Sequence, residues 1–315
     1  MSRIRTGACA VAATLVVLPI HATAWAVAPD RPLRQAAPAV QVLDTGDGYP
    51  VRIQVWPPYP SGSTAQSVIG VLNGLSHDSE MGSLHVSVRT PADVEALCGS
   101  DALACYSDDT ITLPGEQSPG APPVAFLLAH EYAHHILQHR RNDPWPAGLW
   151  GPKRWASGLN VCRKVHQHQL LLGYSSIPSE AYAETFAMMR YPELHLPWYF
   201  TDLLAPDDAI EAAARADVVY PWRGPSTRTY RGRLPAGASR RVRVATPLDG
   251  SARFSTSGRA DVVLELLAGR RVLARARPHG RTTRLNFTIC GQRRLTLRLT
   301  AVRGGGRYAL TVSRP

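Results

Sequence analysis

The stretch Pro123–Gln138, with the sequence PVAFLLAHEYAHHILQ, decides the architecture of the first half of this chain. Apolar residues and histidines recur in it at steps of three and four, as they do on one face of an α-helix. These residues are Phe126, Leu127, His130, His134 and Leu137. Pro123 suits the first helical turn, where a missing N–H costs nothing. The sequence therefore predicts a helix that begins near Val124 and buries the face carrying two spaced histidines.

His130 and His134 lie four residues apart, so on a helix their imidazoles stand one above the other. Two imidazoles in this arrangement can bind one zinc ion, and Glu131 beside them suits a general base that acts on zinc-bound water. On a buried face, histidines without partners would be unfavourable. The pattern predicts a catalytic zinc site with His130 and His134 as ligands and Glu131 as the catalytic residue. His135 and His139 are expected on the surface, facing away from this site.

A catalytic zinc ion of this kind needs a third protein ligand. The metzincin pattern is excluded, because Leu137 and Arg140 occupy the positions of its glycine and its third histidine. Glu180 is the favoured ligand, since the first turn of a predicted helix stabilises an ionised carboxylate. Glu184 follows one turn later and is expected to accept a hydrogen bond from a ligand imidazole. The opposite assignment, with Glu184 as the ligand, stays open.

The motif His130–His134, together with Glu180-Ala181-Tyr182-Ala183-Glu184, resembles the gluzincins, the zincin metallopeptidases with a glutamate as third ligand. In that family the second motif commonly ends in aspartate, where this chain has a longer glutamate. The resemblance covers mainly residues 110–190. It implies a zincin-like fold, one catalytic Zn²⁺ ion and a protein or peptide substrate. It also implies peptide-bond hydrolysis by Glu131-assisted attack of zinc-bound water.

Gluzincins usually add a tyrosine or histidine that stabilises the oxyanion of the transition state. The sequence offers several candidates after the zinc motif and does not select among them. They are Tyr174, Tyr191, His195 and Tyr199.

Residues 1–26 have the features of an export signal peptide. Arg3 and Arg5 precede the apolar run Gly7–Ile20, and small residues follow at the spacing of a cleavage site, which we place after Ala26. The run is shorter than the roughly 20 residues that span a bilayer. We therefore expect no transmembrane segment after cleavage and a secreted or cell-surface location. Abundant arginine and alanine, with only two lysines, are typical of a high-GC bacterial source.

Cleavage would leave four cysteines, Cys98, Cys105, Cys162 and Cys290. An even number in an exported protein indicates two disulfides, which four cysteines can form in three ways. In one of these ways, Cys98 and Cys105 close a short loop while Cys162 and Cys290 join the two halves of the chain.

Charge and strand patterning divide the mature chain. Residues 27–48 are expected to form an extended lead-in, residues 49–222 the zinc metallopeptidase domain, and residues 223–315 an Arg-rich β-sandwich. Residues 27–222 carry 12 basic and 21 acidic side chains, whereas residues 223–315 carry 21 basic and 3 acidic ones. In the last segment, short alternating strands separated by turn signals predict the sandwich.

The last segment also resembles the bacterial pre-peptidase C-terminal domain, through Ala260–Leu266 and Gly306–Val312. The expected fold class is an α+β zincin-like catalytic domain followed by an all-β sandwich domain. The expected function is that of a secreted zinc metallopeptidase. The positive charge of the sandwich indicates binding to an anionic cell-surface polymer. Binding to nucleic acid is not expected, because the chain is exported and its arginines are not interleaved with aromatic residues.

Two other functions stay open. One is a secreted surface-binding protein that uses the basic sandwich and has a structural or vestigial zinc site. The other is an amide hydrolase that acts on cell-wall peptides.

Outside the zinc motif, hydrophobic periodicity predicts further elements of the first half. Strands are predicted at 51–55, 84–88 and 110–113, and helices at 64–75, at 154–172 and from 179 to just before Pro192.

Overall fold

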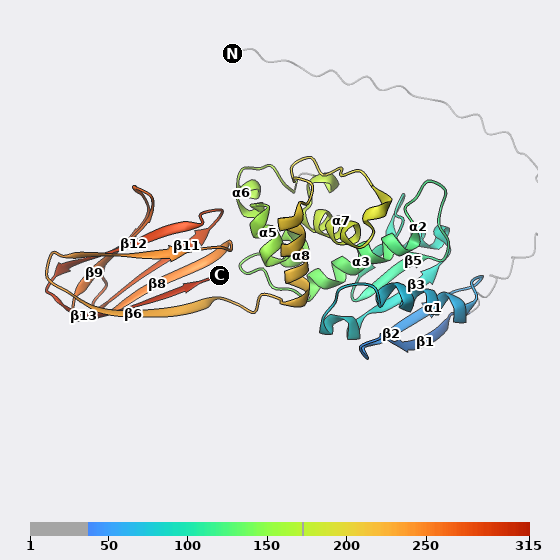
Figure 1. Ribbon diagram of the computed structural model, residues 1–315, viewed down its shortest axis with the longest axis horizontal. Helices are drawn as coiled ribbons and strands as arrows, with labels where there is room; N and C mark the ends of the chain where they lie inside the picture. The colour runs from blue at the N-terminus through green and yellow to red at the C-terminus, as the bar shows by residue number, and fades with distance from the viewer. Residues whose placement is uncertain (1–36, 172) are drawn as a thin grey trace, which may run out of the picture. The chain divides into compact units, whose positions relative to one another are not determined.

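The computed structural model describes residues 37–171 and 173–315, so the predicted signal peptide, residues 1–26, lies outside the described residues. Helices and a mixed sheet make up the chain as far as Val219, and only strands follow from Ser226 (Figure 1). Each of these parts has its own hydrophobic core, one between Val51 and Val218 and the other between Leu234 and Val312. The described chain is therefore mixed α and β first and strand-rich afterwards.

A five-stranded sheet with the order β1-β2-β3-β5-β4 underlies the first part. Strands β2, β3 and β5 pair in parallel, and the edge strands β1 and β4 pair antiparallel to their neighbours. Ile53, Val86 and Ile111 are buried on the three central strands, where β-branched side chains suit the pleated surface. The strand bounds are β1 (Ala39–Asp44), β2 (Pro50–Val55), β3 (His85–Arg89), β4 (Cys105–Ser107) and β5 (Thr110–Pro114).

Two local expectations differ from the structure. Strand β1 lies inside the segment expected as a lead-in. It pairs with β2 as an edge strand and packs Leu43 against the core, while Val40 and Val42 are exposed. The single helix expected over 154–172 is wrong. Asn160 has a left-handed φ of 55°, which ends one helical run and starts another. The segment forms α5 (Lys153–Gly158) and α6 (Val161–His166) instead.

Helix α3 (Val124–Gln138) contacts strand β5 and also helix α7 (Pro178–Arg190), as Figure 1 shows. Ala181, Ala183 and Ala187 of α7 are fully buried, and such small side chains allow two helices to approach closely. The other helices of this part are α1 (Ser61–Leu72), α2 (Pro91–Cys98), α4 (Ala147–Trp150) and α8 (Asp208–Val219), with short 3₁₀ turns η1 (Ser79–Ser83), η2 (Tyr174–Ser176) and η3 (Pro192–Leu194).

The last part consists of two four-stranded antiparallel sheets, β10-β9-β12-β7 and β11-β8-β13-β6. Leu295, Leu297 and Leu299 of β12 point into the core that the sheets share, whereas none of the 21 arginines of residues 223–315 is buried. The strands are β6 (Ser226–Leu234), β7 (Ser239–Ala245), β8 (Gly250–Gly258), β9 (Asp261–Ala268), β10 (Arg271–Ala276), β11 (Thr282–Ile289), β12 (Arg294–Arg303) and β13 (Gly306–Arg314).

Apolar alternation in the sequence predicts strands at 241–244, 262–267, 271–274, 284–288, 295–299 and 308–312, and so misses β6 and β8. Most of β6 is exposed, and β8 is built largely from Ser, Thr and Gly, so neither shows strong apolar alternation in sequence.

Two disulfides are formed, Cys98–Cys105 and Cys162–Cys290. The first joins the end of α2 to β4, and the second joins α6 to the segment after β11. Every helix within residues 37–171 and 173–315 is too short or too polar to cross a membrane.

Candidate metal centre

Helix α3 presents His130, Glu131 and His134 at one buried site. The rings of His130 and His134 lie 5.2 Å apart between centroids, as expected for residues one helical turn apart. His130 and Glu131 are each only 8 % exposed. The apolar residues around them in α3 therefore hold both side chains in fixed positions away from bulk water.

Helix α7 brings Glu180 to the same site from its first turn. One carboxylate oxygen of Glu180, Oε2, lies 3.4 Å from His130 Nε2 and 3.4 Å from His134 Nε2. A tetrahedral zinc ion with bonds of 2.0–2.1 Å would separate neighbouring ligand atoms by about 3.3 Å. Both distances match this separation, and one donor atom of each residue lies within 4.8 Å of the other two, so the three residues could hold a metal.

Glu184 occupies a different position, on the far side of the His130 ring. Its Oε2 lies 3.2 Å from His130 Nδ1, the ring nitrogen that does not face Glu180. A carboxylate there accepts the Nδ1–H hydrogen bond, which fixes the ring orientation and leaves Nε2 free to donate its lone pair. The structure therefore brings Glu180 to the donor cluster and Glu184 behind it.

The electrostatics of the cluster favour a cation. Burial lowers the pKa of His130, but its hydrogen bonds to Glu180 and Glu184 outweigh this and raise the pKa to about 10. Burial raises the pKa of Glu180, yet its hydrogen bonds to the two histidines hold the pKa well below the usual range. Between His130 Nε2 and Glu180 Oε2, a proton on the imidazole occupies the position that a metal ion would fill.

The pKa of Glu131 shifts in the opposite direction to that of Glu180. Burial raises its pKa, although the two neighbouring histidines lower it. A carboxylate with a raised pKa accepts a proton more readily, as a general base must. Glu131 also lines a cleft, which gives it access to a substrate for that chemistry.

The cleft has a volume of about 850 Å³ and is lined by His130, Glu131, His134, Glu180 and Glu184. The Cys98–Cys105 loop forms another part of its lining, from Ser100 to Cys105, and Tyr106 follows it. The sequence marked these cysteines only as disulfide candidates. Nothing in the loop's composition indicates that it lies beside the histidines of α3.

The four oxyanion candidates have different positions. Tyr174 and Tyr199 both line the cleft, with their rings stacked 6.3 Å apart. Burial and the nearby glutamates raise the pKa of Tyr199 to about 12, so its hydroxyl stays protonated and can donate a hydrogen bond. Tyr191 instead packs against Phe126, and His195 is exposed on a turn outside the cleft.

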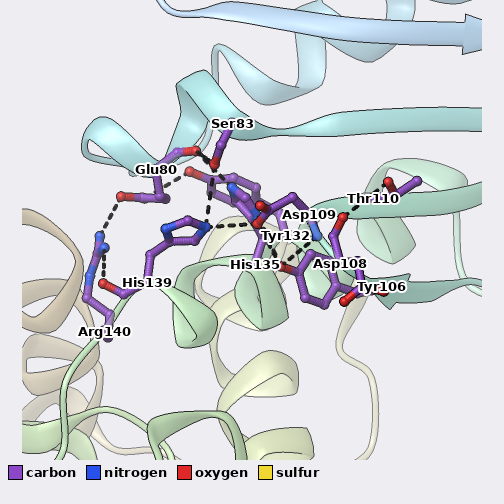
Figure 2. A network of polar contacts seen from close by, with 10 residues as sticks. All are labelled: Glu80, Ser83, Tyr106, Asp108, Asp109, Thr110, Tyr132, His135, His139 and Arg140. Atoms are coloured by element: carbon purple, nitrogen blue, oxygen red, sulfur yellow. Dashed lines mark hydrogen bonds and ion pairs between the residues drawn. The ribbon is translucent and has the colours of Figure 1, made fainter.

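The expectation for His135 is wrong. Its side chain is fully buried and lies against Glu80 (Figure 2), outside the cleft that His130 and His134 line. The 3₁₀ turn η1 covers it, and no periodicity in the sequence reveals that tertiary contact.

The chain matches no protein-family model and no curated protein sequence. The pre-peptidase C-terminal domain of a collagenase from Bacillus anthracis is similar at 19 % identity and a TM-score of 0.23, over 27 % of this chain and 88 % of that one. Aeromonas hydrophila PliG, a periplasmic inhibitor of g-type lysozyme, is similar at 10 % identity and a TM-score of 0.24, over 30 % of this chain and 91 % of its own.

Legionella pneumophila aminopeptidase A, solved in complex with aspartic acid, is similar at 10 % identity and a TM-score of 0.23. That match covers 82 % of this chain and 37 % of the aminopeptidase. The function of the chain must therefore be inferred from its own residues.

Proposed function

We propose that this chain is an exported zinc metallopeptidase that hydrolyses peptide bonds in unstructured protein. The convergence of His130 Nε2, His134 Nε2 and Glu180 Oε2 is the observation that carries the proposal. Among the described residues, this group offers three ligands, which leaves a position open toward the cleft, as in catalytic zinc sites.

Zinc held there would polarise the substrate carbonyl and make water a nucleophile at neutral pH. Glu131 takes the proton from the attacking water and delivers it to the leaving amine, a role that its burial and raised pKa support. Glu184 holds His130 in place through Nδ1. Tyr174 or Tyr199 donates a hydrogen bond to the developing oxyanion from the cleft wall.

Export is part of the same proposal. The predicted signal peptide begins the chain, and two disulfides are compatible with an oxidising compartment. The arginine- and alanine-rich composition supports a bacterial source.

Glu131→Gln tests the mechanism, with turnover of unfolded casein as the readout. We expect at least a roughly 100-fold loss of turnover, because proton transfer by a positioned base contributes about that much. Zinc content and the unfolding midpoint should match those of the parent chain. Glu193→Gln is the matched control, since Glu193 is exposed on η3 outside the cleft. Retained turnover in Glu131→Gln with zinc bound would overturn the mechanism.

A second candidate is a surface-binding protein whose zinc site is structural. The exposure of the arginines of residues 223–315 favours it, because such a surface attracts anionic polymers. Retention on immobilised dextran sulfate that falls with salt, without any casein turnover by the zinc-loaded chain, would support this alternative. If the same chain both binds dextran sulfate and hydrolyses casein, the strand-rich part would serve to hold the protein at a surface and the cleft would carry out the hydrolysis.

A further inference from the structure

A second cluster of possible ligands involves helix α3, and none of its residues lines the cleft (Figure 2). His135 and His139 are one helical turn apart, with ring centroids 4.7 Å from each other. Asp109 reaches them from the turn between β4 and β5. None of these residues belongs to the cluster of His130, His134 and Glu180, so α3 carries two separate pairs of spaced histidines.

The carboxylate of Asp109 contacts both rings. Its Oδ1 lies 3.3 Å from His135 Nδ1 and 2.9 Å from His139 Nε2. One ligand atom from each of the three residues falls within 4.8 Å of the other two. The two distances from Asp109 Oδ1 lie close to the separation of about 3.3 Å expected between neighbouring ligands of a tetrahedral zinc ion.

The environment of His135 decides how it is protonated. His135 Nε2 lies 2.8 Å from the backbone carbonyl oxygen of Glu80, so Nε2 carries hydrogen and donates this bond. With its hydrogen on Nε2, the neutral imidazole has a lone pair on Nδ1. That lone pair faces the carboxylate of Asp109. The Tyr106 hydroxyl, with its single hydrogen, lies 3.2 Å from Asp109 Oδ1 and 3.3 Å from His135 Nδ1.

A histidine that donates one ring N–H to a backbone carbonyl and offers the other nitrogen to a site is oriented as metal ligands usually are. The lone pair of His135 Nδ1 and the carboxylate oxygen Oδ1 of Asp109 face each other at 3.3 Å, and two such electron-rich atoms attract a cation between them. The single hydroxyl hydrogen of Tyr106 can be donated to only one of these two acceptors at a time. A bound metal ion would serve both.

Asp109 is held in an uncommon backbone conformation. The β4–β5 hairpin pairs Ser107 with Thr110, so Asp108 and Asp109 form its two-residue turn. Their φ angles of 47° and 61° are left-handed, a region that such turns usually fill with Asn and Gly. In this conformation, the Asp109 carboxylate points toward α3, where it meets the two histidines (Figure 2).

We propose that Asp109, His135 and His139 form a second metal site, which binds a zinc-type divalent cation and ties the β4–β5 turn to the end of α3. Two imidazoles and one carboxylate suit zinc, whereas calcium and magnesium take mainly oxygen ligands. A hollow lined by Tyr106, Asp108 and Gln138 lies beside the ligands and leaves room for water as a fourth one. Because Cys105 begins β4, an ion here would also steady the disulfide loop that lines the cleft.

Metal stoichiometry tests this second site on the full exported chain. The protein is stripped with a chelator, reloaded with zinc, freed of excess ion and analysed by mass spectrometry for zinc per chain. We expect two zinc ions in the parent, one in Asp109→Asn/His139→Ala and one in His130→Ala/His134→Ala. The first pair of substitutions should fold, since both side chains are partly exposed. His279→Ala is the control, because His279 is an exposed histidine of the strand-rich part, and this variant should retain two zinc ions.

Cobalt provides a second measurement. In His130→Ala/His134→Ala, added Co²⁺ should produce the visible absorption of a site with imidazole ligands, and Asp109→Asn/His139→Ala in that background should abolish it. One zinc per chain in the parent, still present in Asp109→Asn/His139→Ala, would overturn the second site. One zinc that is lost only with Asp109 and His139 would support this site and overturn the proposed catalytic centre instead.

Discussion

Glu80→Gln is predicted to destabilise the first part of the chain far more than the equivalent change of Asp143. Glu80 pairs with Arg140 at 2.8 Å, and Asp143 pairs with Arg141 at 2.7 Å, so the two ion pairs are almost equally short. The side chains of the first pair are 0 % and 5 % exposed, while those of the second are 58 % and 60 % exposed. Burial is therefore the variable that the two substitutions compare.

The magnitude follows from what each substitution leaves behind. In Glu80→Gln, Arg140 keeps its hydrogen bonds to the backbone carbonyls of Asp217 and Val218, but its charge stays buried without a counter-ion. Breaking a buried pair in this way costs about 3–5 kcal/mol. Asp143→Asn leaves a solvated guanidinium, and exposed pairs contribute about 0.2–1 kcal/mol.

Tryptophan fluorescence is the suitable assay, because every tryptophan of the chain precedes residue 223 and so follows unfolding of the helical part alone. A domain of this size shifts its thermal midpoint by roughly 2–4 °C for each kcal/mol. Glu80→Gln should therefore lower the midpoint by at least about 6 °C, and Asp143→Asn by less than about 4 °C. Equal shifts in the two variants would refute the reasoning that burial sets the value of these ion pairs.

Three further predictions concern the metal centre, pH and the disulfides. Glu184→Gln should weaken zinc binding by about tenfold in a chain that lacks the second site, measured by competition with a chromogenic chelator; unchanged affinity would contradict its role behind the ligand ring. Burial lowers the pKa of Lys153 to about 8, below the unfolded value of about 10.4. The free energy of unfolding should therefore fall by about 3 kcal/mol as the pH drops from about 10.4 to about 8. Lys153→Met should not show this fall. Replacing both cysteines of Cys162–Cys290 by alanine should lower the free energy of unfolding by about 5 kcal/mol, against about 2 kcal/mol for Cys98–Cys105. The first bond closes a loop of 128 residues and the second a loop of 7. Urea unfolding followed by circular dichroism measures both losses and shows which is larger.

Local periodicity was sufficient for the elements that bury one clear face. The helix carrying His130 and His134 begins at Val124 as predicted, because its apolar residues repeat at helical steps and Pro123 precedes them. Glu180 also lies in the first turn of its helix, as expected. Strands that bury little, such as β1 and β6, carry no such signal.

Residue types and spacing thus determined by themselves that two imidazoles and a glutamate would stand on one helix, and that a basic strand-rich part would follow. Only the tertiary structure decided which glutamate lies 3.4 Å from both rings and which lies behind His130, since either fits the sequence spacing. It alone joined Asp109 to His135 and His139. That contact depends on a hairpin turn that meets a helix 26 residues later in the chain, and such an approach is fixed by packing, not by periodicity.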